Sequence, residues 1–238
     1  MTDSKLIALI TGAGSGIGAE IAKQLAQKNI HTIITDKNLS GLQKTENSIL
    51  SNNGTCTVAQ LDMQDFAGID RLGMEIFKRW KKLDIMVSNA AMLGTLGPIH
   101  HQNNEEFIEV LNVNSISNYR LIRSFDALLK NSDKPKALFL SSSLAKKPKA
   151  FWGAYAVSKV TLEHIVKIWA LENNHNNLSI SIIDPGKTDT PMRKIAMPGE
   201  ASKNLNKPDD VAKLVLNEIL TDKVYKGDVL EVGKIDIF

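Results

Sequence analysis

Residues 6–27 read LIALITGAGSGIGAEIAKQLAQ, and this stretch joins three patterns that together indicate a fold. It begins with the apolar run 6–11, which is typical of a buried β-strand. A glycine-rich turn follows, and beyond it apolar residues recur at the spacing of an amphipathic helix. A strand, a tight turn and a helix form the first part of a β–α–β unit, so we expect a sheet of parallel strands.

The same alternation of short apolar runs and helical patterns continues along the chain. Helical periodicity is clearest over 66–80 and 162–169. The pattern predicts an α/β fold, with a parallel sheet doubly wound by helices on both faces, in a single domain over residues 1–238. One long irregular stretch, 184–208, follows a predicted strand, and loops of this length tend to be functional. The predicted strands cover 6–11, 31–36, 56–62, 83–89, 136–142, 178–184 and 228–232.

The composition excludes several classes of protein. The chain has 238 residues, of which 43% are hydrophobic and 23% charged, as in an ordinary globular domain. Its 29 basic and 26 acidic residues are spread evenly, which argues against a nucleic-acid partner. A single cysteine, Cys56, forms no internal disulfide or multi-thiolate site, and we expect no metal. No apolar run approaches the ~18 residues of a membrane helix, so we expect a cytoplasmic protein without a membrane partner.

The glycine turn indicates a phosphate site. Gly12, Gly16 and Gly18 follow the spacing G-x-x-x-G-x-G, which lets backbone N–H groups and a helix N-terminus approach a pyrophosphate. Asp36 closes the second predicted strand, where an acid would meet the adenosine ribose hydroxyls and repel a 2′-phosphate. This favours NAD as the cofactor. NADP stays an alternative because Lys37 follows directly and could bind that phosphate.

Tyr155 and Lys159 lie four residues apart, on one face of a predicted helix. A free tyrosine titrates near pH 10, but an ammonium about 5 Å away, at an effective dielectric constant of about 20, favours its phenolate by roughly 3 kcal/mol. General acid/base chemistry by Tyr155 near neutral pH then becomes credible. Ser142, 13 residues before Tyr155, ends a predicted strand where a binding crevice would open.

These motifs occur in a fixed order from about residue 6 to residue 232, and in that order the chain resembles the classical short-chain dehydrogenase/reductase family. The matching landmarks are TGAGSGIG (11–18), Asp62, SNAA (88–91), Asn114, Ser142, YAVSK (155–159) and DPGKTDTPM (184–192). The resemblance implies a seven-stranded Rossmann fold and an NAD(P)-dependent oxidoreductase that interconverts a secondary alcohol and a ketone. It also implies a homodimer or homotetramer acting on a small molecule.

The resemblance assigns the catalytic roles to four residues. Tyr155 would be the general acid/base, and Ser142 would hold the substrate oxygen. Lys159 would bind the nicotinamide ribose and lower the pKa of Tyr155, while Asn114 would hold a water beside Lys159. The implied cofactor contacts are Gly12, Ser15, Gly16, Ile17, Gly18, Asp36, Asp62, Asn89, Tyr155, Lys159, Pro185, Gly186, Thr188 and Thr190.

Several alternatives stay open at this stage. Ser143 competes with Ser142 as the catalytic serine, and SNAA replaces the family's usual N-N-A-G. The loop with Lys146, Lys147 and Lys149 is either a solvated segment or a site for an acidic substrate. The protein could instead be an NADP(H)-dependent 3-oxoacyl-thioester or carbonyl reductase, or a catalytically silent nucleotide-binding interaction protein.

Overall fold

The computed structural model describes residues 5–232 and contains one seven-stranded parallel sheet. The strand order is β3-β2-β1-β4-β5-β6-β7, and every neighbouring pair is parallel. Each of the seven predicted strands is present. They are β1 (Ile7–Thr11), β2 (His31–Asp36), β3 (Cys56–Gln60), β4 (Ile85–Ser88), β5 (Lys136–Leu140), β6 (Ser179–Asp184) and β7 (Lys226–Glu231).

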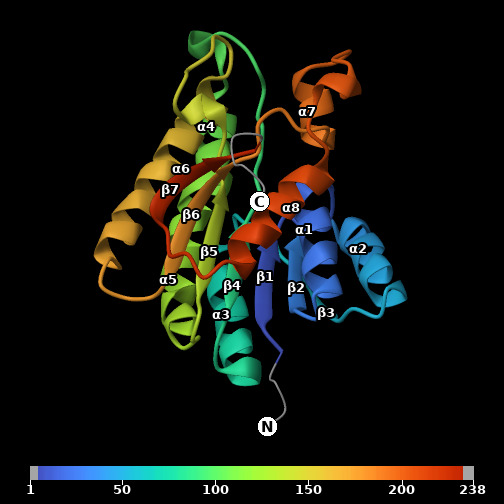
Figure 1. The fold of residues 1–238 in the computed structure, drawn as a ribbon. Helices are drawn as coiled ribbons and strands as arrows, with labels where there is room; N and C mark the ends of the chain where they lie inside the picture. Colours follow the sequence, from blue (N-terminus) through green and yellow to red (C-terminus); the bar gives the residue numbers. More distant parts are fainter. Residues whose placement is uncertain (1–4, 233–238) are drawn as a thin grey trace.

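Helices cover both faces of this sheet, as Figure 1 shows. One face carries α1 (Gly16–Gln27), α2 (Leu39–Ser51) and α8 (Pro208–Leu220). The other carries α3 (Phe66–Trp80), α5 (Ser117–Lys130) and α6 (Gly153–Glu172), with α4 (Asn104–Leu111) packed on α6. Two apolar clusters result, one on each face. The central strands β1, β4 and β5 are therefore buried along their whole length, and apolar residues follow one another in them without alternation.

Side chains at the helix starts explain why the helices begin where they do. Asn38 and Asp65 cap α2 and α3 by accepting backbone N–H groups three residues on, at 3.1 and 2.8 Å. Asn103 caps α4 in the same way, at 2.9 Å. Such caps satisfy donors that have no partner within the helix. The starts of these three helices are therefore determined by residues close to them in the sequence.

The order of strands fixes where a ligand can bind. From β1 the chain moves outward through β2 and β3, then crosses over to β4 and continues in the opposite direction to β7. The connections after β1 and β4 diverge at this switch point, which opens a crevice at the carboxyl ends of the strands. The glycine turn, Asn89 and the serines after β5 all lie at these carboxyl ends.

The stretch expected to be irregular, 184–208, is only partly so. It contains α7 (Pro191–Ala196) and a short 3-10 helix (Ser202–Asn204). Thr190 caps α7 by accepting the Arg193 N–H at 3.1 Å, and Pro191 occupies its first turn. Thr-Pro is a helix-start signal, so this helix could be recognised from sequence.

The single-domain Rossmann prediction is confirmed for the described residues, which share one sheet. That the domain extends over 1–238 stays a prediction, because 1–4 and 233–238 lie outside them. Within 5–232, none of the helices has the length and apolar character needed to cross a bilayer.

Candidate active site

Two adjoining cavities open at the carboxyl ends of the strands, and most predicted site residues line them. The first, here the glycine cavity, measures about 180 Å³, and the second, here the serine cavity, about 260 Å³. Both are lined by Tyr155 and Thr190. Gly12, Ser15, Gly16, Ile17, Asp36, Asn89, Lys159 and Pro185 line the glycine cavity, whereas Ser142, Gly186 and Thr188 line the serine cavity.

The glycine turn brings main chain close to the cavity. Gly16 starts α1 with a φ of 56°, a left-handed conformation that glycine adopts without strain. A Cβ there would lie 3.4 Å from Cγ2 of Thr190, across the cavity. Ser15 precedes the helix without capping it through its side chain, so the N–H groups of the first turn are available to an anion.

Gly18 does not line the glycine cavity, and it affects this turn through its packing against Gly12 and Asn89. A Cβ on Gly18 would come within 2.4 Å of both the Gly12 carbonyl oxygen and Asn89 Nδ2. Asn89 Nδ2 in turn donates to the carbonyl oxygens of Thr11 and Gly12, at 3.0 and 3.1 Å. The predicted cofactor contact of Gly18 stays a prediction, while its packing against Asn89 explains why a glycine is needed.

Asp36 ends β2 with its carboxylate at the cavity wall. One oxygen accepts the Gly14 N–H at 3.1 Å and the other accepts the Asn38 N–H at 2.9 Å. Asp62 lines a neighbouring cavity of about 100 Å³ together with Asp36 and Lys37. Its carboxylate accepts the Gln64 N–H at 2.9 Å. Both acids line cavities at the carboxyl ends of their strands, and their contacts with an adenosine stay predictions.

Tyr155, Ser142 and Lys159 converge between the two cavities. A side-chain hydrogen bond joins Ser142 to Tyr155. Lys159 is 2% exposed, and its Nζ lies 5.6 Å from the centre of the Tyr155 ring and donates to the Leu140 carbonyl oxygen at 2.8 Å. The helical spacing thus does bring the tyrosine and lysine together.

The expected lowering of the Tyr155 pKa is wrong for this arrangement. Burial, reinforced by the nearby Asp184 carboxylate, raises the pKa of Tyr155 to about 12, although the Ser142 hydrogen bond acts in the other direction. Burial also lowers the pKa of Lys159 to about 8, and Glu163 opposes that change. The attraction of the Lys159 ammonium does not include the free-energy cost of moving the Tyr155 phenolate out of water.

The structure separates the three serines after β5. Ser141 donates to Glu163 at 2.8 Å, so its hydroxyl points away from Tyr155. The Ser143 N–H is bonded to the Asp184 carboxylate. Only Ser142 is brought into a hydrogen bond with Tyr155. This geometry favours Ser142 over Ser143.

Asn114 lies in a π-helical turn (Asn112–Ile116) between α4 and α5 and is completely buried. Its amide accepts the Met92 N–H at 2.7 Å and donates to the Met92 carbonyl at 2.8 Å and to Ser158 Oγ at 2.9 Å. Asn114 therefore ties the segment after β4 to the helix that carries Lys159. Holding a water beside Lys159 stays a prediction.

Two carboxylates were not singled out from the sequence. Glu163 is 4% exposed and accepts from Ser141 and from Lys167, the latter at 2.9 Å. Because it follows Lys159 by four residues, the helical spacing that paired Tyr155 with Lys159 could have found it. Asp184 lies at the end of β6, and its contacts with the serine loop depend on the tertiary structure alone.

The residues of the glycine cavity fit a dinucleotide. A helix N-terminus and glycine main chain suit a pyrophosphate, and Asp36 suits the ribose hydroxyls. Among residues 5–232, no group of three or more His, Cys, Asp and Glu side chains is suited to a metal ion.

Comparisons with known proteins agree with this geometry. Residues 6–201 match the family model described as short chain dehydrogenase. The uncharacterized oxidoreductase YciK of Escherichia coli (strain K12) is 31% identical over 221 residues, covering 88% of this chain and 84% of that protein.

Two solved structures are similar in fold over nearly the whole chain. A Shigella flexneri 2a str. 301 protein in complex with NADP is 29% identical, with a TM-score of 0.91, and the match covers 95% of this chain and 96% of that one. An Escherichia coli CFT073 protein in complex with NADPH gives the same identity and TM-score, with 96% of each chain covered. The chain belongs to the classical short-chain dehydrogenase/reductase family and is an oxidoreductase that works with NAD(P).

Proposed function

We propose that this protein interconverts a secondary alcohol and a ketone, with Tyr155 as the general acid/base. The observation that supports this most is the convergence of Tyr155, Ser142 and Lys159 where the two cavities meet. When bound, NAD(H) would supply or accept a hydride at the substrate carbon. The cofactor would be held by the glycine turn, Asp36, Asn89 and the residues after β6, and Lys159 would bind its ribose.

In reduction, the O–H bond of Tyr155 breaks as its proton passes to the carbonyl oxygen, and oxidation returns a proton to Tyr155. Ser142 holds the substrate oxygen next to Tyr155 through a hydrogen bond. With a pKa of about 12, Tyr155 is protonated at neutral pH and is ready to donate. The free site is therefore prepared for ketone reduction, and alcohol oxidation needs a higher pH.

The Tyr155→Phe variant tests this mechanism. Removing the hydroxyl that transfers the proton to the substrate oxygen should lower kcat/KM by roughly 10²- to 10⁴-fold while leaving the Kd of NADH within about twofold. Tyr119→Phe is the matched control, because Tyr119 lies on α5 with 47% exposure and lines neither cavity. Undiminished activity in Tyr155→Phe would exclude the mechanism. Cofactor binding without turnover of any alcohol or ketone would support a silent nucleotide-binding protein instead.

We assign NAD(H) as the preferred cofactor because the Asp36 carboxylate lies at the cavity wall and would repel a 2′-phosphate. NADP(H) is the second candidate, together with a carbonyl or 3-oxoacyl-thioester substrate. It is favoured by Lys37, which lines the neighbouring cavity of about 100 Å³ together with Asp36, and by the two similar structures that contain NADP or NADPH.

Two substitutions separate these cofactor assignments. Asp36→Asn removes the repulsive charge and should tighten NADPH binding by about tenfold or more, with a smaller effect on NADH. Lys37→Met should change the Kd of NADPH little if Asp36 controls the choice. Titration of the wild type with both cofactors completes the test. Tighter binding of NADPH than NADH, together with a weakened NADPH complex in Lys37→Met, would establish NADP(H).

We also expect a homodimer or homotetramer in the cytoplasm. Apolar side chains are exposed on α6, with Val157 and Val160 at 43 and 41% exposure. Light scattering after size-exclusion chromatography measures the oligomer directly, and a monomeric mass would contradict this assignment.

A further inference from the structure

The serine cavity is small and is lined by both Tyr155 and Ser142. Its volume of about 260 Å³ falls just below the range of roughly 300–1,000 Å³ typical of ligand pockets. It has room for a compact molecule, and the long chain of a carrier-bound substrate would have to remain mostly outside.

One part of the wall of this cavity is an apolar cluster that is separate from the two sheet clusters. Trp152 and Ala196 form its buried part, and Leu93, Leu144 and Met197 pack against them. The Trp152 and Tyr155 rings meet edge to face, with their centres 6.0 Å apart. An apolar body beside Tyr155 would therefore contact the Trp152 ring and the apolar side chains around it.

The charged residues that line the cavity are unbalanced. Among the described lining residues, four are charged: Lys149, Lys187, Arg193 and Glu200. Arg193 holds Glu200 through two hydrogen bonds of 2.6 and 2.8 Å. Lys187 lies 3.9 Å from the same carboxylate, and Lys149 also acts on it electrostatically. Three cations around one carboxylate leave two positive charges in excess.

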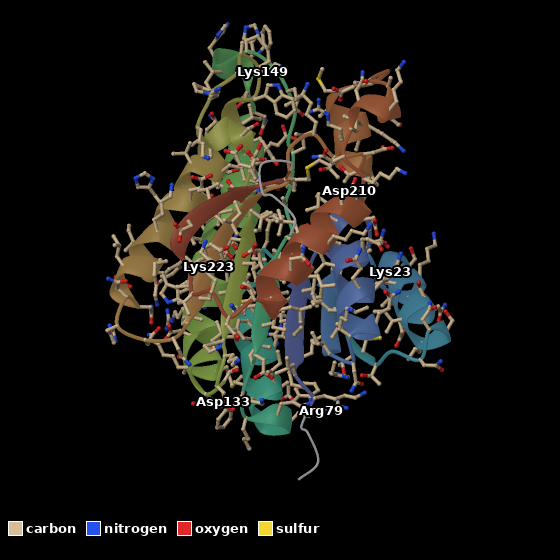
Figure 2. The ribbon with its side chains drawn as sticks, in the orientation of Figure 1. Lys23, Arg79, Asp133, Lys149, Asp210 and Lys223 are labelled. Carbon is tan, nitrogen blue, oxygen red and sulfur yellow. The ribbon has the colours of Figure 1, made fainter. Side chains whose placement is uncertain are left out.

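The three lysines in the loop after β5 have different surroundings. Lys146 forms an ion pair with Glu231 at 2.9 Å, and Lys147 does not line the cavity. Lys149 does line it, and its Nζ lies 5.7 Å from the centre of the Trp152 ring. Figure 2 shows Lys149 beyond the same end of the sheet as α7, which carries Arg193. One lysine of the three therefore faces the substrate space.

We propose that the substrate is a small keto acid or the corresponding hydroxy acid, with a compact apolar body and a carboxylate that Lys149 and Lys187 attract. This inference rests on the proposed function. The carboxylate itself does not react; reduction adds a hydride and a proton across the carbonyl group alone. Arg193 holds Glu200 through two hydrogen bonds, whereas Lys187 lies at the longer distance of 3.9 Å, so the Glu200 carboxylate neutralises only part of the positive charge around it.

A matched pair of ketones tests the proposal. 4-Acetylbenzoate and 4-acetylbenzamide share one body and differ in charge. With saturating cofactor, kcat/KM should be at least tenfold higher for the acid, and this advantage should shrink as salt is added. In the double variant Lys149→Gln/Lys187→Gln the ratio should fall close to one. Lys147→Gln, on the same loop but outside the cavity lining, should keep the wild-type ratio.

A binding experiment separates this inference from the proposed function. Calorimetric titration of the protein without cofactor should show benzoate binding at least fivefold tighter than benzamide, and the double lysine variant should lose the difference. If no alcohol or ketone, these two included, is turned over but benzoate keeps its advantage, the proposed function fails and the anion site stands. If both ketones are reduced equally and benzoate has no advantage, the keto-acid inference is wrong and the function stands. A higher kcat/KM for acetoacetyl coenzyme A than for acetoacetate, the corresponding free keto acid, would also overturn the inference.

Discussion

Asp184 connects two walls of the candidate active site from a buried position at the end of β6. It is 6% exposed, and its Oδ1 accepts the Gly186 N–H at 3.0 Å. The carboxylate also accepts the Ser143 N–H, next to Ser142. Its negative charge contributes to the raised pKa of Tyr155. We therefore regard Asp184 as a positioning residue that also makes Tyr155 a weaker acid.

Asp184→Asn should move the pH dependence of alcohol oxidation to lower pH. Oxidation needs deprotonated Tyr155, and removing a nearby negative charge makes the phenolate easier to form. We expect the rising limb of kcat/KM to shift down by roughly one pH unit or more. The charged groups that bear on this limb are Asp184 on β6 and Lys159 on α6. The measurement is a pH–rate profile for oxidation.

The control for this variant is Asp222→Asn. Asp222 pairs with Lys134 at 2.7 Å in the segment before β7, at the amino ends of the strands. Its loss should leave the profile in place. If Asp184→Asn lowers the oxidation rates but its rising limb stays at the wild-type pH, then Asp184 acts only by holding the walls of the site in position.

At the scale of elements, the first turn of α1 depends on close packing against the segment after β4. Gly18→Ala adds a Cβ that would meet the Gly12 carbonyl and Asn89 Nδ2 at 2.4 Å, so the turn or Asn89 must move. We expect a loss of about 1–3 kcal/mol in the free energy of unfolding and weaker NADH binding. Denaturant unfolding and cofactor titration measure the two effects.

Gly97→Ala is the matched control, since a Cβ at Gly97 would meet no atom within 4 Å. Its unfolding free energy should stay within about 0.5 kcal/mol of the wild type. Equal stability and equal NADH affinity in Gly18→Ala and Gly97→Ala would contradict the role given to the Gly12–Asn89 contact.

The elements could be predicted from sequence where the signals are local. The apolar runs in the sequence predict all seven strands, although the predicted strand 136–142 extends beyond Leu140, where β5 ends in the structure. The chain turns away after Leu140 because Ser142 caps a short 3-10 helix (Ser143–Ala145), with its Oγ accepting the Leu144 N–H at 3.3 Å. The π-helical turn around Asn114 has no local signal, because it is held by Met92 and Ser158.

At the scale of the whole molecule, the order of the motifs predicted which residues would meet, but not their electrostatics. Tyr155 and Lys159 do come together, yet burial moves both pKa values against their charged forms. Burial depends on the packing of α6 against the sheet and on α4. No spacing within YAVSK carries that information. The fold and the pairing of Tyr155 with Lys159 could therefore be predicted from the sequence, whereas the direction of the Tyr155 pKa shift could not.

The lowered pKa of Lys159 makes the stability of the whole protein depend on pH. Unfolded, this lysine binds its proton up to about pH 10.4, whereas the folded protein releases it near pH 8. Between these values the unfolded state binds more protons, so the free energy of unfolding rises with pH. Above about pH 10, the raised pKa of Tyr155 acts in the opposite direction, because the unfolded state then loses a proton that the folded state keeps.

Lys159→Met removes the lysine contribution and keeps an apolar chain of similar length. Relative to this variant, the wild type should gain about 3 kcal/mol in unfolding free energy between pH 8 and pH 10.4, and little between pH 6 and pH 7. Lys130→Met, which removes a lysine from an exposed ion pair with Asp126, is the control and should run parallel to the wild type. Denaturant unfolding at each pH gives the values. A constant difference between wild type and Lys159→Met across this range would mean that Lys159 titrates normally, and that the charge beside Tyr155 persists throughout the pH range in which the enzyme would work.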